Sequence, residues 1–317
     1  MSALRVALCA ATYRRPQGLR RLLKAVAALE LRAGQGRKLD VIIVDNSAEG
    51  QARSLVEGFA TVFPWPLHYV SEPRRGITFA RNTALTRASE LAADAVAFID
   101  DDEFPDPGWL DALLNRRRVS GAAVVLGAVQ PLFPSGTPAW IINGGFFETH
   151  RFADGAAIGD AHTANVLVDL HALRRHGLSF DHRFALRGGE DTLLFRDLLN
   201  AGERMVYAAD AVVYETVPES RARLGWLMRR WYRPGNVEAE LFLRGHEASR
   251  WRPAVNSLRG LLRVAGGSAL FAVNLLVLGL GERRRIVRPL YTLCRGCGLI
   301  ASTLGHDHLE YRKVHGA

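Results

Sequence analysis

The sequence predicts an α/β protein with a mostly parallel central sheet flanked by helices, followed by a C-terminal helical hairpin. Two observations support this prediction. Short apolar runs alternate with helical patterns in the N-terminal part, and two long apolar stretches flank an arginine-rich turn near the C-terminus. Strand–helix–strand order implies parallel strands with helices packed on the sheet. The 317 residues, 48% of them hydrophobic, suffice for a large core.

The N-terminal part supplies the first strands. Residues 5–12 and 39–47 are apolar runs rich in branched side chains, which predicts buried strands, and residues 66–73 form a weaker third strand. Between the first two strands, apolar residues recur at spacings of three and four, which is typical of an amphipathic helix. These residues are Leu19, Leu22, Leu23, Val26 and Leu29.

The following segments continue the alternation. Residues 77–93 are expected to form a helix and residues 94–100 a buried strand, with a further strand at 122–129. Residues 186–202 predict a turn leading into a helix, and residues 203–215 predict another strand. Ligands in such sheets bind at the carboxyl ends of the strands, where the runs TYRR, DNS and DDDE lie.

Four consecutive acids, Asp100, Asp101, Asp102 and Glu103, close a buried strand. Their carboxylates repel one another, and a divalent cation would offset the repulsion. Mg²⁺ or Mn²⁺ is typically held by one or two carboxylates together with substrate phosphates. A solvated acidic turn that merely ends the strand is the alternative interpretation.

Three further sites carry polar side chains. Asp45 ends the second strand, where its carboxylate either accepts hydrogen bonds from a base or ribose, or caps the next helix. Arg81 follows a glycine-punctuated loop and could pair with a phosphate or stack on a ring. The run Gly188–Asp191 places two acids at the mouth of a helix, where an ordinary N-cap is the alternative.

Five motifs in this order form a specific combination: TYRRP, VDNS, EPRRGITFARNTAL, AFIDDDEFPDPGWLDALL and GGEDTLLFRDL. The chain resembles the family 2 glycosyltransferases, which have the GT-A fold, over about residues 4–235. The later runs WLMRRWYRPGN and GLIASTLGHDHLEYRK are similar to a bacterial subgroup that builds exopolysaccharides of the succinoglycan type.

The resemblance implies a nucleotide-sugar site near the first strands. Thr12, Arg14 and Asp45 match positions that line the nucleotide-base pocket, and Arg81 lies near them. Asp101 is assigned to the same nucleotide-sugar site.

The resemblance also implies a metal site and a catalytic base. Asp100 and Asp102 match the ends of the DxD motif, in which the first acid faces ribose and metal and the last ligates Mg²⁺ or Mn²⁺. Asp191 matches the general base of the ED motif, and Glu190 would help to shape the acceptor site.

Arg230 and Trp231 match the RW end of the QxxRW motif of processive relatives, which implies contact with the diphosphate. Position 227 is Leu instead of Gln, so addition of one sugar is expected rather than long-chain processivity.

These residues predict an inverting sugar transfer. The diphosphate gains charge as the glycosidic bond breaks, and a metal with nearby arginines would stabilise that charge. One carboxylate base without a covalent nucleophile predicts a β-linked product from an α-linked donor. The expected partners are a nucleotide-sugar donor, at family level UDP-glucose, and a glycan or lipid-linked acceptor.

Basic charge is concentrated at the C-terminal end. Residues 221–317 hold 17 Lys and Arg against 6 Asp and Glu, whereas residues 1–220 hold 24 against 26. Such asymmetry suggests an anionic partner for this end of the chain. We expect a catalytic domain over residues 1–235 and a basic, apolar helical region over residues 236–317.

Two apolar segments, residues 264–280 and 290–304, are joined by an arginine-rich turn. The first is at the lower limit for a spanning helix. We expect a hairpin that lies in the membrane interface with its arginines on anionic headgroups, and a hairpin packed on the catalytic domain is the alternative. Three cysteines and the lack of a secretory signal pattern predict a cytoplasmic protein, peripheral on the inner membrane.

Other classes of protein fit less well. A nucleic-acid-binding protein would need basic and aromatic residues on a recognisable module, and no nucleic-acid partner is expected. A nucleotidyltransferase or phosphotransferase that uses the same DxD metal chemistry stays open. A dinucleotide oxidoreductase is disfavoured because no GxGxxG run follows the first strand.

Overall fold

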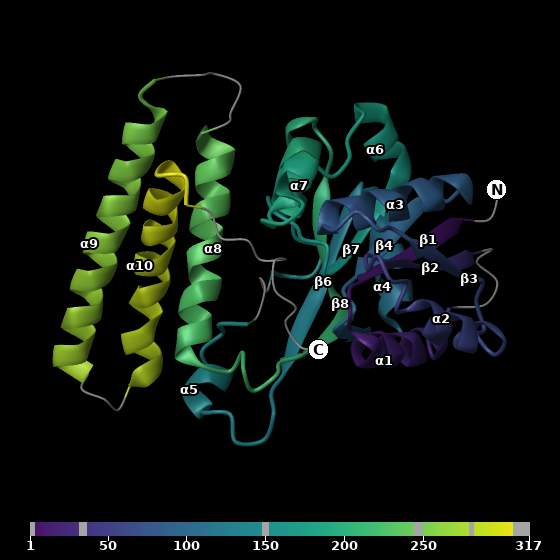
Figure 1. Ribbon diagram of the computed structural model, residues 1–317, viewed down its shortest axis with the longest axis horizontal. Helices are drawn as coiled ribbons and strands as arrows, with labels where there is room; N and C mark the ends of the chain where they lie inside the picture. The colour runs from purple at the N-terminus through teal and green to yellow at the C-terminus, as the bar shows by residue number, and fades with distance from the viewer. Residues whose placement is uncertain (1–3, 32–36, 148–151, 244–249, 279–281, 307–317) are drawn as a thin grey trace. The chain divides into compact units, whose positions relative to one another are not determined.

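The computed structural model describes residues 4–31, 37–147, 152–243, 250–278 and 282–306, which form two compact units (Figure 1). The first unit comprises the described residues up to 132 and from 152 to 216. The second comprises residues 133–147 and the described residues from 217 onward. The domain boundary expected after residue 235 therefore falls inside the second unit.

The first unit is built on an eight-stranded sheet in the order β3-β2-β1-β4-β7-β6-β8-β5. Strands β1 to β4 run parallel to one another, β7 is antiparallel to both of its neighbours, and β8 is parallel to β6. The mostly parallel sheet is as predicted. The strands are β1 Arg5–Thr12, β2 Lys38–Asp45, β3 Leu67–Ser71, β4 Ala95–Ile99, β5 Glu103–Pro105, β6 Val124–Leu132, β7 Asn165–Asp169 and β8 Met205–Thr216.

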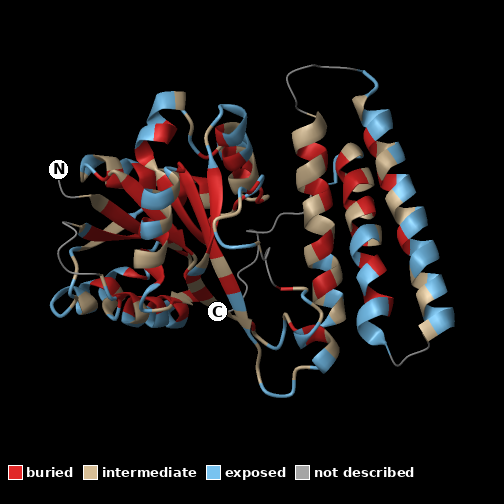
Figure 2. Ribbon diagram, turned by 180° about the vertical axis from the view of Figure 1, so that it is seen from behind, coloured by how far each residue is buried: buried red, intermediate tan, exposed pale blue. Residues whose placement is uncertain are grey.

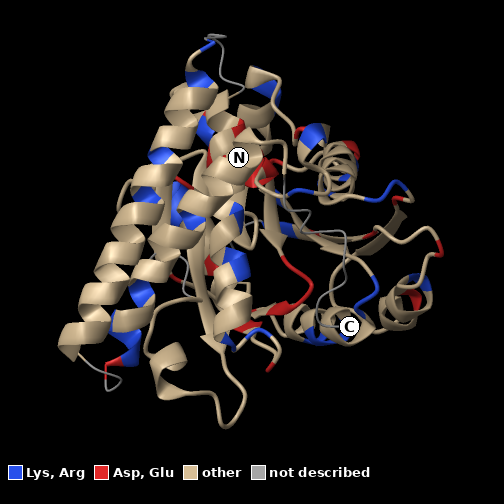
Figure 3. Cartoon of the chain, turned by 60° about the vertical axis from the view of Figure 1, so that its left-hand side comes forward, with Lys and Arg blue, Asp and Glu red and all other residues tan. Residues whose placement is uncertain are grey.

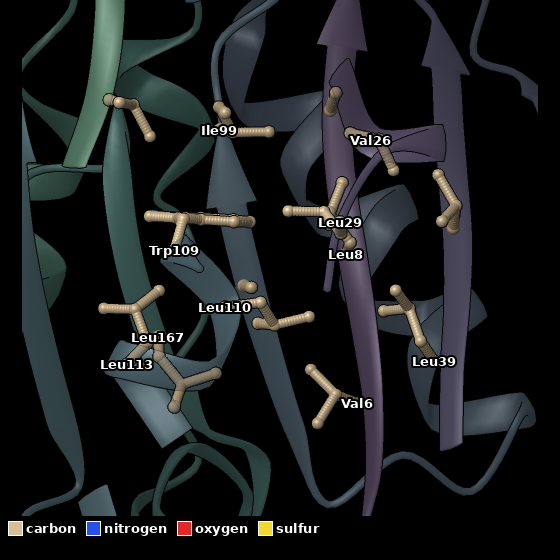
Figure 4. Close-up of a cluster of buried hydrophobic side chains, with 14 of the residues drawn as sticks. Val6, Leu8, Val26, Leu29, Leu39, Ile99, Trp109, Leu110, Leu113 and Leu167 are labelled. Atoms are coloured by element: carbon tan, nitrogen blue, oxygen red, sulfur yellow. The ribbon is translucent and has the colours of Figure 1, made fainter. Parts of the chain in front are cut away.

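Helices cover both faces of this sheet because successive side chains of each strand point to opposite sides. Val6 and Leu8 face one core with α1, α2 and α4, whereas Ala7 and Cys9 face a second core with α3, α6 and α7. Figure 4 shows the first core, where the Trp109 ring lies among strand side chains such as Leu8. The helices are α1 Pro16–Ala27, α2 Arg53–Ala60, α3 Ile77–Glu90, α4 Trp109–Ser120, α6 Leu170–His176 and α7 Glu190–Asn200.

Strand β7 was not expected from the sequence, and one buried side chain explains its place. Asn165 donates from Nδ2 to the carbonyl oxygens of Ala128 and Ala211, both at 2.8 Å. Its Oδ1 accepts a hydrogen bond from Trp109 Nε1 at 2.7 Å. These bonds satisfy backbone groups beside an irregularity between Gly127 and Ala128, where β6 and β8 shift register.

The second unit is helical, with α5 Ala139–Ile142, α8 Leu224–Leu243, α9 Arg252–Leu278 and α10 Arg283–Thr303. Helices α9 and α10 form the predicted hairpin, although α9 begins twelve residues earlier than the apolar segment suggested. Residues 279 and 280 of the predicted segment lie outside the described part of the chain.

Glycines allow α8 and α10 to approach closely. A Cβ atom at Gly298 would lie 2.2 Å from the Tyr232 carbonyl oxygen, and one at Gly235 would lie 2.2 Å from that of Arg295. Asn236 then donates from Nδ2 to the Gly298 carbonyl oxygen at 2.8 Å. The backbones of the two helices therefore come into direct contact at these glycines.

Candidate functional site

The acidic turn Asp100–Glu103 follows β4 and lies against helix α1. Pro16 starts this helix, and Gly18 lies in its first turn. A Cβ atom at Gly18 would lie 2.5 Å from the Asp101 carbonyl oxygen, so only glycine allows this approach. This close contact with helix α1 thereby fixes the position of the acidic turn relative to the helix.

Arg15 and Thr12 hold the middle acid of the turn. Thr12 Oγ1 donates to Asp101 Oδ2 at 2.8 Å, and Arg15 Nη1 donates to Asp101 Oδ1 at 2.9 Å and to Asp102 Oδ2 at 3.1 Å. Asp101 is only 4% exposed, whereas the side chains of Asp102 and Asp100 are 21% and 43% exposed. Asp100 and Asp102 are therefore more accessible to a ligand than Asp101 is.

Helix α3 is joined to the segment that precedes α7. Asn82 donates from Nδ2 to the Phe180 carbonyl oxygen at 2.8 Å and accepts from the Phe180 N–H at 2.9 Å. The Ile77 N–H donates to the Ala185 carbonyl oxygen at 3.0 Å. Gly76 has a φ of 143°, and a Cβ atom there would lie 2.6 Å from Ala185 Cβ. These contacts set the start of α7 relative to α3.

Arg81 on α3 joins two of the predicted acidic segments. Its buried guanidinium donates to Glu190 Oε1 and, at 3.3 Å, to Asp100 Oδ1. One side chain therefore contacts the end of β4 and the start of α7, segments that lie ninety residues apart in sequence. The acids of the DxD and ED motifs converge on one centre.

The first turn of α7 separates its two acids. Gly188 and Gly189 have φ angles of 79° and 93°, which glycine adopts readily, and the helix begins at Glu190. The Glu190 side chain is buried toward Arg81. Asp191 is partly exposed, and its Oδ1 accepts a hydrogen bond from the Thr192 N–H at 2.8 Å. Asp191 is thus the more exposed member of the pair.

The electrostatics of this centre favour a cation. Displacement of water by the protein raises the pKa of Asp100, and the Asp102 and Asp191 carboxylates raise it further. The guanidinium groups of Arg81 and Arg15 oppose this rise. Carboxylates from both motifs are therefore close enough to repel one another.

The pKa of Glu103 is raised as well. Burial raises its pKa well above the ordinary glutamate value, and the nearby Asp100 and Glu215 carboxylates add to the rise. Among the described residues, no group of three or more His, Cys, Asp or Glu side chains is arranged to hold a metal ion.

The other predicted nucleotide-site residues have contacts of their own. Asp45 is buried and accepts hydrogen bonds from Ser47, from the Ala52 N–H and from the Tyr69 hydroxyl. These bonds close the loop between β2 and α2, whose N-cap residue Ala52 has no side-chain cap of its own.

Arg14 is exposed, and its guanidinium forms an ion pair with Glu49 at 2.9 Å. The backbone φ angle of Arg14 is 56°. Its guanidinium carbon lies 5.3 Å from the centre of the Tyr13 ring, and that of Arg75 lies at the same distance from this ring. Tyr13 and Arg75 therefore accompany Arg14, although neither was singled out as a site residue.

Arg230 and Trp231 belong to α8 in the second unit. Trp231 is buried, and its ring lies 5.4 Å from that of Phe146 and 6.1 Å from that of Tyr291. Arg230 lies over the ring of Phe147 at 5.8 Å. Both side chains are thus part of an aromatic cluster of this unit.

Sequence reasoning missed Arg15 and Gly18. A partial signal exists, because Pro16 predicts a helix start and places Arg15 at its N-cap and Gly18 in its first turn. The sequence does not indicate which of two adjacent arginines turns toward the acids.

Comparison with known proteins agrees with this architecture. Residues 8–177 match the profile of the family described as "Glycosyl transferase family 2". The chain is 34% identical to the succinoglycan biosynthesis protein ExoM of Rhizobium meliloti (strain 1021), over 94% of this chain and 93% of that protein.

Solved structures show the same fold. The mannosyltransferase PcManGT from Pyrobaculum calidifontis, in complex with GDP-Man and Mn²⁺, aligns with a TM-score of 0.60 at 21% identity, over 96% of this chain and 88% of that one. S. aureus TarS 1–349, in complex with UDP-GlcNAc, aligns with a TM-score of 0.52 at 16% identity, over 92% of this chain and 90% of that one. The chain therefore belongs to glycosyltransferase family 2 and is a glycosyltransferase with the GT-A fold.

Proposed function

We propose that this enzyme transfers a hexose, with inversion, from a nucleotide sugar to a glycan or lipid-linked acceptor in exopolysaccharide biosynthesis. The observation that carries the proposal is the contact of Arg81 with both Asp100 and Glu190, which joins the DxD and ED motifs. The similarity to a succinoglycan biosynthesis protein supports the exopolysaccharide role. Glucose is the proposed sugar, with UDP-glucose as the proposed donor.

Asp102 and Asp100 are the residues proposed to hold Mg²⁺ or Mn²⁺. Their oxygens are the ligands that these ions prefer, and burial together with the neighbouring Asp102 and Asp191 carboxylates raises the pKa of Asp100. The bound Mn²⁺ of the mannosyltransferase supports this choice. When bound, the ion would act as a Lewis acid that stabilises the charge of the leaving diphosphate.

The donor is proposed to bind along the ends of β1 and β2. Thr12, Arg14 and Asp45, with Arg81 and Asp101, form the proposed nucleotide-sugar site. Because Thr12 and Asp101 form a buried hydrogen bond with one another, they are proposed to hold the backbone of the site in place rather than to contact the nucleotide. The exposed Arg14 would then face the nucleotide directly.

Asp191 is the proposed general base. Its carboxylate is partly exposed and would accept the proton of the attacking acceptor hydroxyl. Glu190, paired with Arg81, would keep the start of α7 in place beside the acceptor. A single base without a covalent nucleophile gives inversion, so an α-linked donor yields a β-linked product.

Arg230 and Trp231 are proposed to contact the diphosphate, with the catalytic domain spanning residues 1–235. Leu227 occupies the position of the Gln found in processive relatives, which supports addition of one sugar. Because Trp231 is buried, this role would fall mainly to the Arg230 guanidinium.

The C-terminal helices are proposed to associate with the cytoplasmic face of the inner membrane. Among the described helices, α9 alone is long and apolar enough to cross a membrane, by its length and composition. Its largely exposed surface supports an interfacial position.

Purified enzyme with Mn²⁺, a panel of sugar nucleotides and lipid extract tests the proposal. We expect release of UDP from UDP-glucose that depends on the acceptor, and a β-linked product by NMR. Release of UMP would favour a nucleotidyl- or phosphotransferase, and an α-linked product would exclude the inverting mechanism.

A further inference from the structure

A cluster of charged side chains joins the three long helices of the second unit. Glu238 of α8 accepts hydrogen bonds from Arg259 and Arg263 of α9 and from Arg295 of α10. The distances from Arg263 and Arg295 are between 2.8 and 3.1 Å. We call these four residues the arginine cluster.

The arginine cluster carries more positive than negative charge. One carboxylate is shared by three guanidinium groups, which leaves a net charge of +2. Burial by itself would raise the pKa of Glu238, but Arg263 and Arg295 outweigh it and lower that pKa, so the carboxylate stays ionised. Glu238 is 17% exposed, whereas the three arginines are 29 to 37% exposed, so solvent reaches the cationic side.

The guanidinium groups are already held in place. Arg259 lies over the Phe242 ring at 5.0 Å, and Arg295 donates to the Tyr291 hydroxyl at 3.2 Å. Each guanidinium has five N–H donors in a planar fork, and one carboxylate cannot accept them all. A second anion could therefore bind without ordering these side chains anew.

The surface beside the arginine cluster is apolar. Leu270 and Val277 follow Arg263 at intervals of seven residues, so all three lie on the same side of α9. Figure 2 shows that the outward side of α9 is largely exposed, and Figure 3 shows basic residues along the three helices. The exposed apolar residues of α9 include Leu261, Leu262, Leu270, Val273, Leu276 and Val277.

The charges at the other end of the hairpin indicate how α9 would meet a bilayer. The uncharged stretch of the sequence, residues 264–280, is seventeen residues long, whereas a helix that spans a bilayer needs about twenty apolar residues. A spanning hairpin would also carry exposed Arg283, Arg284, Arg285 and Arg288 across the membrane. A helix that lies along the surface keeps arginines at both of its ends among the headgroups.

We propose that Arg259, Arg263 and Arg295 form a binding site for the phosphate group of an anionic lipid headgroup, on a membrane along which α9 lies. The proposal rests on the membrane association proposed above and adds a defined site to it. Guanidinium forks bind phosphate oxygens in pairs, whereas a lysine ammonium offers only a point charge.

The test measures binding of the full chain to phosphatidylcholine vesicles with and without phosphatidylglycerol, by co-sedimentation. The double variant Arg263→Lys/Arg295→Lys keeps the charge but loses the forks. We expect it to bind phosphatidylglycerol vesicles about tenfold more weakly than the wild type. The matched control Arg283→Lys/Arg284→Lys changes two exposed residues of α10 and should bind as the wild type does.

Glu238→Gln provides a second test with the opposite sign. Removal of the competing carboxylate should strengthen binding to phosphatidylglycerol vesicles by about fivefold. This expectation holds even if the double lysine variant does not fold, which circular dichroism would reveal.

The outcomes separate the two proposals. If the wild type binds neither kind of vesicle, the proposed membrane association is wrong. If it binds phosphatidylglycerol vesicles but the double lysine variant binds equally well, or Glu238→Gln binds no more tightly, attraction is diffuse and the phosphate site is wrong.

Discussion

The two units of this protein combine carboxylates and arginines in opposite proportions. In the α/β unit, Asp100, Asp101, Asp102 and Glu190 form ion pairs with Arg15 and Arg81, so acids are in excess. In the helical unit, one acid, Glu238, pairs with three arginines. The acid-rich centre is the one proposed to hold a cation, and the arginine-rich centre is the one proposed to hold an anion.

The difference also appears in the direction of the pKa shifts. Burial and neighbouring acids raise the pKa of Glu103 in the α/β unit, whereas arginines outweigh burial and lower the pKa of Glu238 in the helical unit. Charge excess, rather than the number of ion pairs, indicates which ligand each centre suits.

Arg81→Met should produce the largest effect. It removes the cation that faces buried Glu190 and Asp100, and breaking a buried ion pair costs about 3–5 kcal/mol. We expect a large loss of stability by urea denaturation and no detectable turnover. Arg87→Met, at a half-buried position of the same helix where Arg87 pairs with the exposed Glu90, should change the stability much less. Equal stability of the two variants would contradict the role given to Arg81.

Asp191→Asn should leave the fold intact and reduce turnover by about 10³-fold, because a general base contributes about 10²- to 10⁴-fold. The measurement is the rate of UDP release with a saturating acceptor. Asp210→Asn, at an exposed position of β8, is the matched control and should be as active as the wild type. Full activity of Asp191→Asn would mean that another group takes the proton.

Gly18→Ala should cost about 1–3 kcal/mol, since the added methyl would overlap the Asp101 carbonyl oxygen and shift the acidic turn. Thermal unfolding measures the stability, and a rise in the Mn²⁺ concentration needed for half-maximal activity would report the displaced turn. Gly58→Ala in α2 has open space around it and should be stabilising by about 0.5–1 kcal/mol. If both alanines have the same effect, α1 does not position the turn.

The pH dependence of the free energy of unfolding should differ between variants of the two units. These are the smallest effects that we expect. Glu238 has a lowered folded pKa, so its contribution is present above the ordinary value of 4.5 and lost as pH falls through the folded pKa. Glu238→Gln should therefore cost about 1 kcal/mol at neutral pH and nothing in strong acid.

Glu103→Gln should show the reverse, because the raised folded pKa of Glu103 makes its ionisation unfavourable as pH rises above 4.5. The variant should match the wild type in acid and equal or exceed its stability at neutral pH. Urea denaturation across this range checks both variants, and parallel pH profiles would contradict the contrast between the units.

Local patterns predicted β1 and β2 well because each of these strands is eight residues long and mostly buried. The strand expected at residues 5–12 coincides with β1, and the order of the acids along β2, β4 and α7 indicated a common centre. Strand β7, only five residues long, depends on Asn165, whose partners come from β6, β8 and α4. No local pattern contains those contacts.

The parts of the site that could not be predicted involve side-chain direction. The runs TYRR and DDDE do not indicate that Arg15 bonds to Asp101 while Arg14 turns to Glu49. The arginine cluster was also hidden, because Glu238, Arg259 and Arg295 are spread over three helices. Their meeting depends on how these helices pack.

Binding of Mn²⁺ is the most direct test of the acid-rich centre as a metal and nucleotide site. Titration of the wild type and of Asp102→Asn by electron paramagnetic resonance, with and without UDP, measures it without turnover. The account predicts that UDP strengthens Mn²⁺ binding to the wild type and that Asp102→Asn abolishes this gain. Equal Mn²⁺ binding by both proteins in the presence of UDP would contradict it.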